Sequence, residues 1–210
     1  MRFSQRRGRI FGWLMGSALA IGGFLPPAFA DSLPSAFVQS LAAAASSDET
    51  VAAWYRGTGY ATLWAGENDV ARREALFAAL DTAHDHGLPE SRYDAAGLKA
   101  AFANAVTEGD RGRLELRMTE TYLRWAHDLT SGMLQPKKLD PTIVRDIAVE
   151  DSGHLLDLIA RGEPAGVLHD LVPQSEVYVQ LMKAKIGLEI QIDAGGWGAE
   201  VPASALAPGD

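Results

Sequence analysis

Apolar residues recur at helical spacing along most of the chain, and most regularly between Asp110 and Gly132. The apolar positions of that segment form one long stripe of five residues, which three more widen: Leu114, Met118, Tyr122, Trp125 and Leu129, with Leu116, Leu123 and Ala126. Steps of three and four residues place side chains on one face of a helix. A face this wide predicts a helix that is buried on more than one side.

Capping residues and helix breakers delimit the other expected helices. The pattern predicts helices over 34–45, 49–55, 69–86, 95–106, 152–161 and 164–172, and a last one opening at Ser175. Side chains that can accept a backbone N–H precede most of them: Asp48, Asp69, Asp94, and Asp151 or Ser152. Gly87 suits the left-handed conformation that ends a helix. Only Gly187 to Asp193 resembles a short strand, and 133–141 is expected to be irregular. The sequence therefore predicts an all-α fold, a compact helical domain.

The N-terminal 30 residues have the three parts of a secretory signal. Four arginines precede an apolar stretch of about 16 residues, and Ala28-Phe29-Ala30 forms a small-residue cleavage pattern. The stretch is shorter than the roughly 20 residues that a membrane-spanning helix needs. We therefore expect cleavage after Ala30, release into the periplasm and no stable membrane anchor. Arg6-Arg7 leaves both the general and the twin-arginine export routes open.

Charge and cysteine content exclude several functions. The chain has a net charge of −8, and removing residues 1–30 takes away four arginines and no acid, which gives −12. Nucleic acids and anionic membranes attract proteins that are rich in Lys and Arg, so neither is an expected partner of this acidic chain. The sequence contains no cysteine, which excludes disulfides, thiolate metal sites and a cysteine nucleophile.

Three carboxylates of the long helix are candidates for acid–base chemistry, and a Ser/His/Asp arrangement stays open because such triads form in space rather than in sequence. Glu115, Glu120 and Asp128 offer a pair for glycoside hydrolysis. Each also has an arginine three or four residues away, as Asp128 has Arg124, and Glu120, Arg124 and Asp128 can pair along one side. Because buried carboxylates are rare, an ion-paired helix surface is the favoured interpretation. No G-x-S-x-G elbow, phosphate-binding loop or dinucleotide fingerprint is present.

The histidines and aromatic residues have a structural interpretation. Helical zinc sites use two histidines four residues apart, whereas His84 and His86 are two apart and are expected at a polar helix end. His127 is expected to be solvated, and His154 and His169 have no nearby ligand cluster. A core is favoured over a carbohydrate-binding platform for five aromatic residues: Trp54, Tyr55, Trp64, Tyr122 and Trp125. We therefore expect no catalytic residue, no cofactor and no metal.

Five segments, in this order, resemble one family. They are Trp54-Tyr55-Arg56 with Tyr60 and Trp64; Gly87-Leu88-Pro89 with Tyr93; Thr121 to Leu129 continuing through Gly132, Pro136 and Lys138-Leu139-Asp140; Pro173 with Tyr178 and Leu181; and Gly195-Gly196-Trp197 with Pro208-Gly209-Asp210. Together they resemble the N-terminal scaffold domain of the large, multi-domain murein L,D-transpeptidases of Gram-negative bacteria.

The resemblance implies a domain organisation and a role. It implies a signal peptide over 1–30, a lead segment over 31–47, a helical scaffold domain over 48–192, and a linker over 193–210. That linker would lead toward a peptidoglycan-binding and catalytic region that this chain lacks. The implied role is the non-catalytic scaffold portion of a periplasmic enzyme that cross-links peptidoglycan and remodels the cell wall.

The family's catalytic domain carries a cysteine nucleophile, which this chain lacks, so no catalytic residue can be assigned. The expected partners are peptidoglycan or the downstream domains of a longer polypeptide, contacted through the Gly132–Asp140 loop with Lys137 and Lys138. For the two lysines, however, a solvated loop is favoured over a binding role. The alternatives are a stand-alone envelope binding or regulatory module and a helical muramidase.

Overall fold

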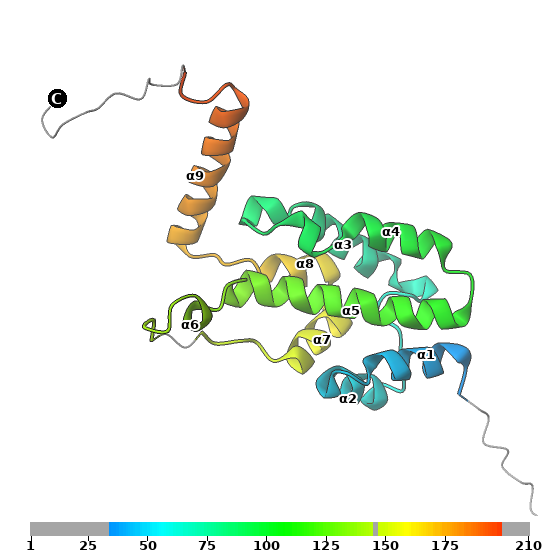
Figure 1. The fold of residues 1–210 in the computed structure, drawn as a ribbon. Helices are drawn as coiled ribbons and strands as arrows, with labels where there is room; N and C mark the ends of the chain where they lie inside the picture. The colour runs from blue at the N-terminus through cyan, green and yellow to red at the C-terminus, as the bar shows by residue number, and fades with distance from the viewer. Residues whose placement is uncertain (1–33, 145–146, 199–210) are drawn as a thin grey trace, which may run out of the picture. The chain divides into compact units, whose positions relative to one another are not determined.

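A computed structural model describes residues 34–144 and 147–198, and every regular element in these ranges is helical (Figure 1). The all-α prediction is confirmed. The expected signal peptide, its cleavage site and the end of the expected linker lie outside the described residues. The α-helices are α1 (Ala36–Ala45), α2 (Glu49–Gly57), α3 (Val70–Asp81), α4 (Ala95–Asn104), α5 (Glu108–Ser131), α6 (Pro136–Leu139), α7 (Ser152–Arg161), α8 (Pro164–Asp170) and α9 (Glu176–Asp193). Short 3₁₀ helices span Glu67–Asp69, Ala83–His86 and Glu90–Arg92.

Helix α5 is the centre of the fold, and α1, α4 and α7 pack on it while α8 packs on α3 (Figure 1). The predicted apolar stripe is confirmed, since all eight of its residues are buried. The helix begins two residues before Asp110. Thr107 and Asp110 form a reciprocal capping box there, in which each side chain accepts the other's backbone N–H.

Helix α1 approaches α5 closely because position 112 is a glycine. A Cβ atom built on Gly112 would lie 2.4 Å from the carbonyl oxygen of Phe37 and 3.1 Å from the amide nitrogen of Leu41. The two backbones can therefore meet at this distance only without a side chain at position 112.

A buried non-helical segment, Leu63 to Ala65, is held in the core by a single carboxylate. Glu115 accepts backbone N–H groups from Leu63 at 2.6 Å, Trp64 at 3.1 Å and Ala65 at 2.8 Å. The hydroxyl group of Tyr55 donates to the same carboxylate over 2.8 Å. Buried backbone N–H groups must be paired. Glu115 therefore supplies the hydrogen-bond acceptors that backbone carbonyls would provide in a helix or sheet.

Three arginines complete this arrangement from the carbonyl side. Arg72 donates to the carbonyl of Leu63 at 2.8 Å, Arg73 to that of Trp64 at 2.7 Å, and Arg111 to that of Ala65 at 2.7 Å. Arg72 also donates to the carbonyl of Ile159 at 2.9 Å. The segment is therefore fixed to α3, α5 and α7 through side chains.

Three expectations about element bounds are wrong. The helix expected to reach His86 ends at Asp81, because the Thr82 hydroxyl bonds back to the carbonyls of the last turn and a 3₁₀ turn follows. Gly87 closes that turn in the predicted left-handed conformation, with φ +76°. The residues 187–193 are the end of α9 rather than a strand. They continue the series of backbone hydrogen bonds of the helix that Ser175 caps. A strand would instead need a neighbouring strand to pair with. Within 133–141, residues 136–139 form the short helix α6.

The side chain of Asp69 also differs from its expected role. It makes no cap hydrogen bond to the first turn of α3. Instead it accepts the backbone N–H of Gly66 at 2.9 Å and pairs with Arg72 at 3.0 Å. The predicted caps at Asp48 and Asp94 are formed, and of the two candidates Asp151 and Ser152 it is Asp151 that caps α7. The last helix opens at Ser175 as predicted, and the Ser175 side chain caps it.

Candidate functional site

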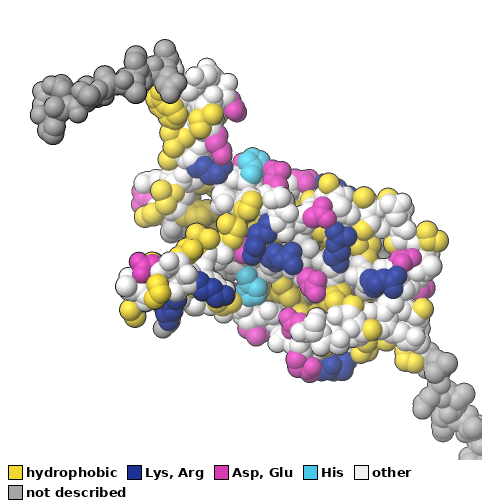
Figure 2. Space-filling view, in the orientation of Figure 1, with side chains coloured by type: hydrophobic (Ala, Val, Ile, Leu, Met, Phe, Trp, Pro, Cys, Tyr) yellow, Lys and Arg dark blue, Asp and Glu magenta, His cyan; other side chains and the backbone are white. Residues whose placement is uncertain are grey.

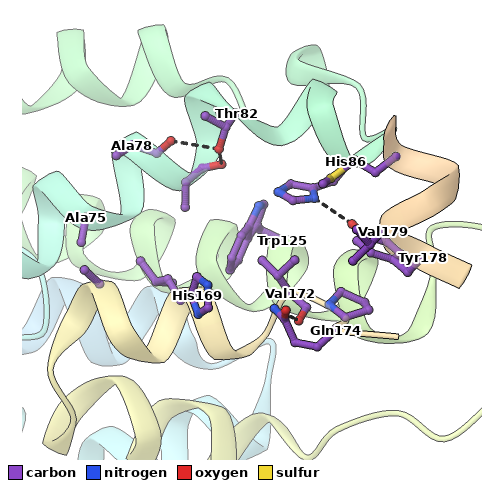
Figure 3. A pocket seen from close by; sticks show the side chains of 15 residues that line it. Ala75, Ala78, Thr82, His86, Trp125, His169, Val172, Gln174, Tyr178 and Val179 are labelled. Carbon is purple, nitrogen blue, oxygen red and sulfur yellow. Dashed lines mark hydrogen bonds between the residues drawn. The ribbon is translucent and has the colours of Figure 1, made fainter. Parts of the chain in front are cut away.

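A cavity of about 510 Å³ lies where the start of α9 meets the body of the domain (Figure 3). Alanines of α3, among them Ala75 and Ala79, form one wall, and Leu168 of α8 forms another. Tyr178 and Met182 of α9 close it on a third side. The alanines leave open the space that larger residues would fill. Pro173 ends the preceding segment and Ser175 caps α9, which together set where the helix begins.

His86 and Tyr178 join the body to α9 at the edge of this cavity. The Nδ1 atom of His86 and the hydroxyl oxygen of Tyr178 are 2.7 Å apart, and the rings stack with centroids 6.2 Å apart. Burial lowers the pKa of His86 below its ordinary value and raises the pKa of Tyr178. Both shifts favour the neutral forms, which suits a hydrogen bond donated by the Tyr178 hydroxyl to Nδ1.

The indole of Trp125 lies among the lining residues of the cavity (Figure 3). Only 1% of its surface is exposed, and its Nε1 atom has no hydrogen-bond partner. A buried N–H group without an acceptor is uncommon and calls for an explanation.

The cavity is mostly apolar. Its lining residues include no Asp, Glu, Lys or Arg; the polar side chains are those of Thr82, His86, Trp125, His169, Gln174 and Tyr178. This composition suits binding by shape and a few hydrogen bonds, and it does not supply the paired acid and base that hydrolysis needs.

A comparison with models of protein families shows which family the chain belongs to. The family model described as Scaffold domain matches residues 49–184, from the start of α2 to the middle of α9. The chain belongs to the Scaffold domain family. No curated protein matches the sequence, and no solved structure matches it.

Two of the three carboxylates named from the sequence are not on the surface of the scaffold domain. Glu115 is completely buried, and burial raises its pKa although the N–H donors around it oppose that shift. Its interpretation as part of an ion-paired helix surface is therefore wrong. The reason is non-local, since its partners come from residues 50 or more positions earlier in the chain. Glu120 is exposed, as expected.

Asp128 is also buried, contrary to expectation. It does not continue the pairing along α5 but binds Arg92, with one contact of 3.1 Å from Nη2 to Oδ1, and accepts the hydroxyl of Tyr93 at 2.8 Å. These bonds tie the turn after Gly87 to α5. Glu115 and Asp128 thus both have structural roles, and the scaffold domain does not bring them together as an acid–base pair.

The histidines are spread over the domain. His84 pairs with Asp85 at 2.9 Å and Glu90 at 3.0 Å. His127, expected to be solvated, is partly buried; its Nε2 lies 3.3 Å from the Ser152 hydroxyl. His154 and His169 are exposed. Across 34–144 and 147–198, no three His, Cys, Asp or Glu side chains gather where a metal ion could bind.

The aromatic residues belong to the core, as predicted. Tyr55, Trp64, Tyr122 and Trp125 are buried, and the partly buried Trp54 donates its indole N–H to Asp157 at 2.9 Å. The Gly132–Asp140 loop, predicted as a contact surface, lines a second cavity of about 520 Å³ together with His127 and Ile147. In the part of the chain that the structure describes, no helix combines the length and apolarity that crossing a bilayer requires.

Proposed function

We propose that this scaffold domain is the non-catalytic scaffold portion of a periplasmic L,D-transpeptidase, which holds a peptidoglycan-acting catalytic domain in place. The family match over residues 49–184 supports the scaffold role. The sequence segments that resemble the murein L,D-transpeptidases support the enzyme context. The absence of cysteine from the chain means that the nucleophile has to come from another domain.

The observation that carries the proposal is an exposed apolar stripe along α9. Val177, Leu181, Leu188 and Ile192 are 67%, 65%, 53% and 57% exposed, and Ala184 lies between them. With 100° per residue these five positions fall on one face of the helix. Figure 2 shows hydrophobic side chains gathered along this helix.

A second, neighbouring face of α9 is apolar as well. Tyr178 and Met182 line the cavity, and Ile186 follows them one turn later, partly buried. A helix that is apolar on two faces is stable when both are covered, and a contiguous exposed apolar patch marks an interaction surface. The body of the domain contacts only the first turns of this second face, and the stripe is exposed throughout, so we propose that the catalytic domain covers the stripe.

The buried and partly buried charges of the domain fit a supporting role. Glu115, Asp128 and Arg72 all bind backbone groups or side chains that connect separate elements. Their hydrogen bonds make the body rigid, and a rigid body can hold a second domain at a fixed position.

Muropeptide analysis tests the proposal. Deleting the coding sequence from its source bacterium should lower the proportion of direct diaminopimelate–diaminopimelate cross-links, and the intact chain should restore it. The double variant Leu181→Glu/Leu188→Glu should fail to restore it, because two charges would have to be desolvated at the interface. Both positions are exposed, so the variant should melt like the parent protein.

Lys183→Gln is the matched control. Like each Leu→Glu change, it lowers the charge at its site by one unit, but it does so at an exposed position of α9 away from the stripe. This variant should restore the cross-links. Unchanged cross-links after deletion would overturn the proposal. If the purified chain then sedimented with isolated sacculi, the stand-alone envelope module would become the better hypothesis.

A further inference from the structure

We propose that the cavity beneath α9 is a binding site for a neutral, mostly apolar small molecule that carries one hydrogen-bond acceptor, such as a carbonyl oxygen, placed against Nε1 of Trp125. This ligand site goes beyond the scaffold role and does not depend on the enzyme context.

The buried indole N–H is the first reason. Leaving a buried donor without an acceptor costs a protein about 1–3 kcal/mol. Trp125 is 1% exposed and its Nε1 has no partner among the described residues. By contrast, the indoles of Trp54 and Trp64 donate to Asp157 and Thr119. Since Trp125 lines the cavity, a bound acceptor can reach this N–H group once the side chains that cover Nε1 shift aside.

The size and lining of the cavity are the second reason. Small-molecule sites usually have volumes of about 300–1,000 Å³ with mostly apolar walls and a few placed polar groups, and this cavity has about 510 Å³. Alanines on α3 and Leu168 on α8 supply the apolar walls (Figure 3). A ligand bound here would remove these apolar walls from water, which favours binding.

The charge of the lining selects the ligand class. A charged ligand would have to give up its hydration in a cavity whose lining includes no residue of opposite charge. Burial favours neutral His86 by lowering its pKa, so His86 adds no cation to the edge of the cavity at neutral pH. A neutral molecule loses only weak hydration and gains the bond to Trp125.

The binding of two matched compounds to the purified chain tests the inference. The probes are 9-fluorenone and fluorene, which share a neutral three-ring frame and differ in one carbonyl oxygen. Equilibrium dialysis should show saturable binding of both, with fluorenone bound roughly 3- to 10-fold more tightly, as one hydrogen bond predicts. In Trp125→Phe, which keeps an aromatic ring and removes the N–H, the two compounds should bind equally.

Three further variants keep the result interpretable. Ala79→Leu fills the cavity and should weaken the binding of both compounds at least tenfold. Ala100→Leu makes the same change on an exposed face of α4 and should leave the binding of both compounds unchanged. Trp54→Phe removes a different indole and should leave the preference for fluorenone intact. Thermal melting of each variant establishes that it is folded. The inference is overturned if neither compound binds saturably, which would leave the cavity as a seat for a partner's side chain, or if the preference persists in Trp125→Phe.

Discussion

The hydroxyl group of Tyr55 on α2 donates a 2.8 Å hydrogen bond to the carboxylate of Glu115 on α5, and both side chains are completely buried. Glu115 also accepts the three backbone N–H groups of the 63–65 segment. A negative charge in the core is therefore surrounded by donors, and burial raises the pKa of the Tyr55 hydroxyl well above its ordinary value.

Replacing this carboxylate should destabilise the domain strongly. Glu115→Gln puts an NH₂ group where an acceptor was needed, and each buried donor left without an acceptor costs about 1–3 kcal/mol. Urea unfolding followed by circular dichroism should show the loss. Glu120→Gln makes the same change on the exposed side of α5 and should stay within about 0.5 kcal/mol of the parent. Equal stability of the two variants would mean that Glu115 does not hold the segment.

The contact between α1 and α5 should not tolerate a methyl group. In Gly112→Ala the added Cβ would lie 2.4 Å from the Phe37 carbonyl oxygen, which is backbone and has to move. We expect a loss of about 1–3 kcal/mol, as for other overpacked sites. Gly187→Ala on α9 meets nothing within 4 Å and should instead add up to about 1 kcal/mol through helix propensity. Thermal melts of both variants measure the contrast, and a stabilised Gly112→Ala would contradict the close approach.

The His86–Tyr178 contact should weaken in acid. Burial lowers the pKa of His86 below its ordinary 6.5, so the unfolded chain takes up this proton more readily than the folded one. The stabilisation is therefore present above about pH 6.5 and is lost as the pH falls through the lower, folded-state value. The difference in unfolding free energy between the parent and His86→Gln should be larger at about pH 7.5 than at about pH 5.5. The exposed His169→Gln should show a smaller change with pH, and an equal change would exclude His86 as the source.

Export should remove the first 30 residues. The basic start, the apolar stretch and Ala28-Phe29-Ala30 predict a mature N-terminus at Asp31. N-terminal sequencing of protein released from the periplasm tests this. Ala30→Asp places a charge at the cleavage site and should leave the precursor uncut, whereas Ser32→Ala should be processed normally. Unprocessed protein in the cytoplasm of the native host would refute the prediction.

The sequence by itself determined much of the local structure. Helical spacing identified α5 and its buried stripe, and capping residues located the starts of α2, α4, α7 and α9. These features could be derived because a helix depends on residues three and four positions apart and on the side chain just before it.

Only the tertiary structure decided which hydrogen-bond partners the polar side chains have. Glu115 and Asp128 have arginine neighbours on their own helix, yet they bind Leu63 to Ala65 and Arg92, respectively. His86 and Tyr178, which form a hydrogen bond, are 92 positions apart in the sequence. Nε1 of Trp125 has no partner because the helices around the cavity place no hydrogen-bond acceptor beside it. A side chain's hydrogen bonds depend on which groups the whole fold brings within about 3 Å, and helical periodicity contains no information on that distance.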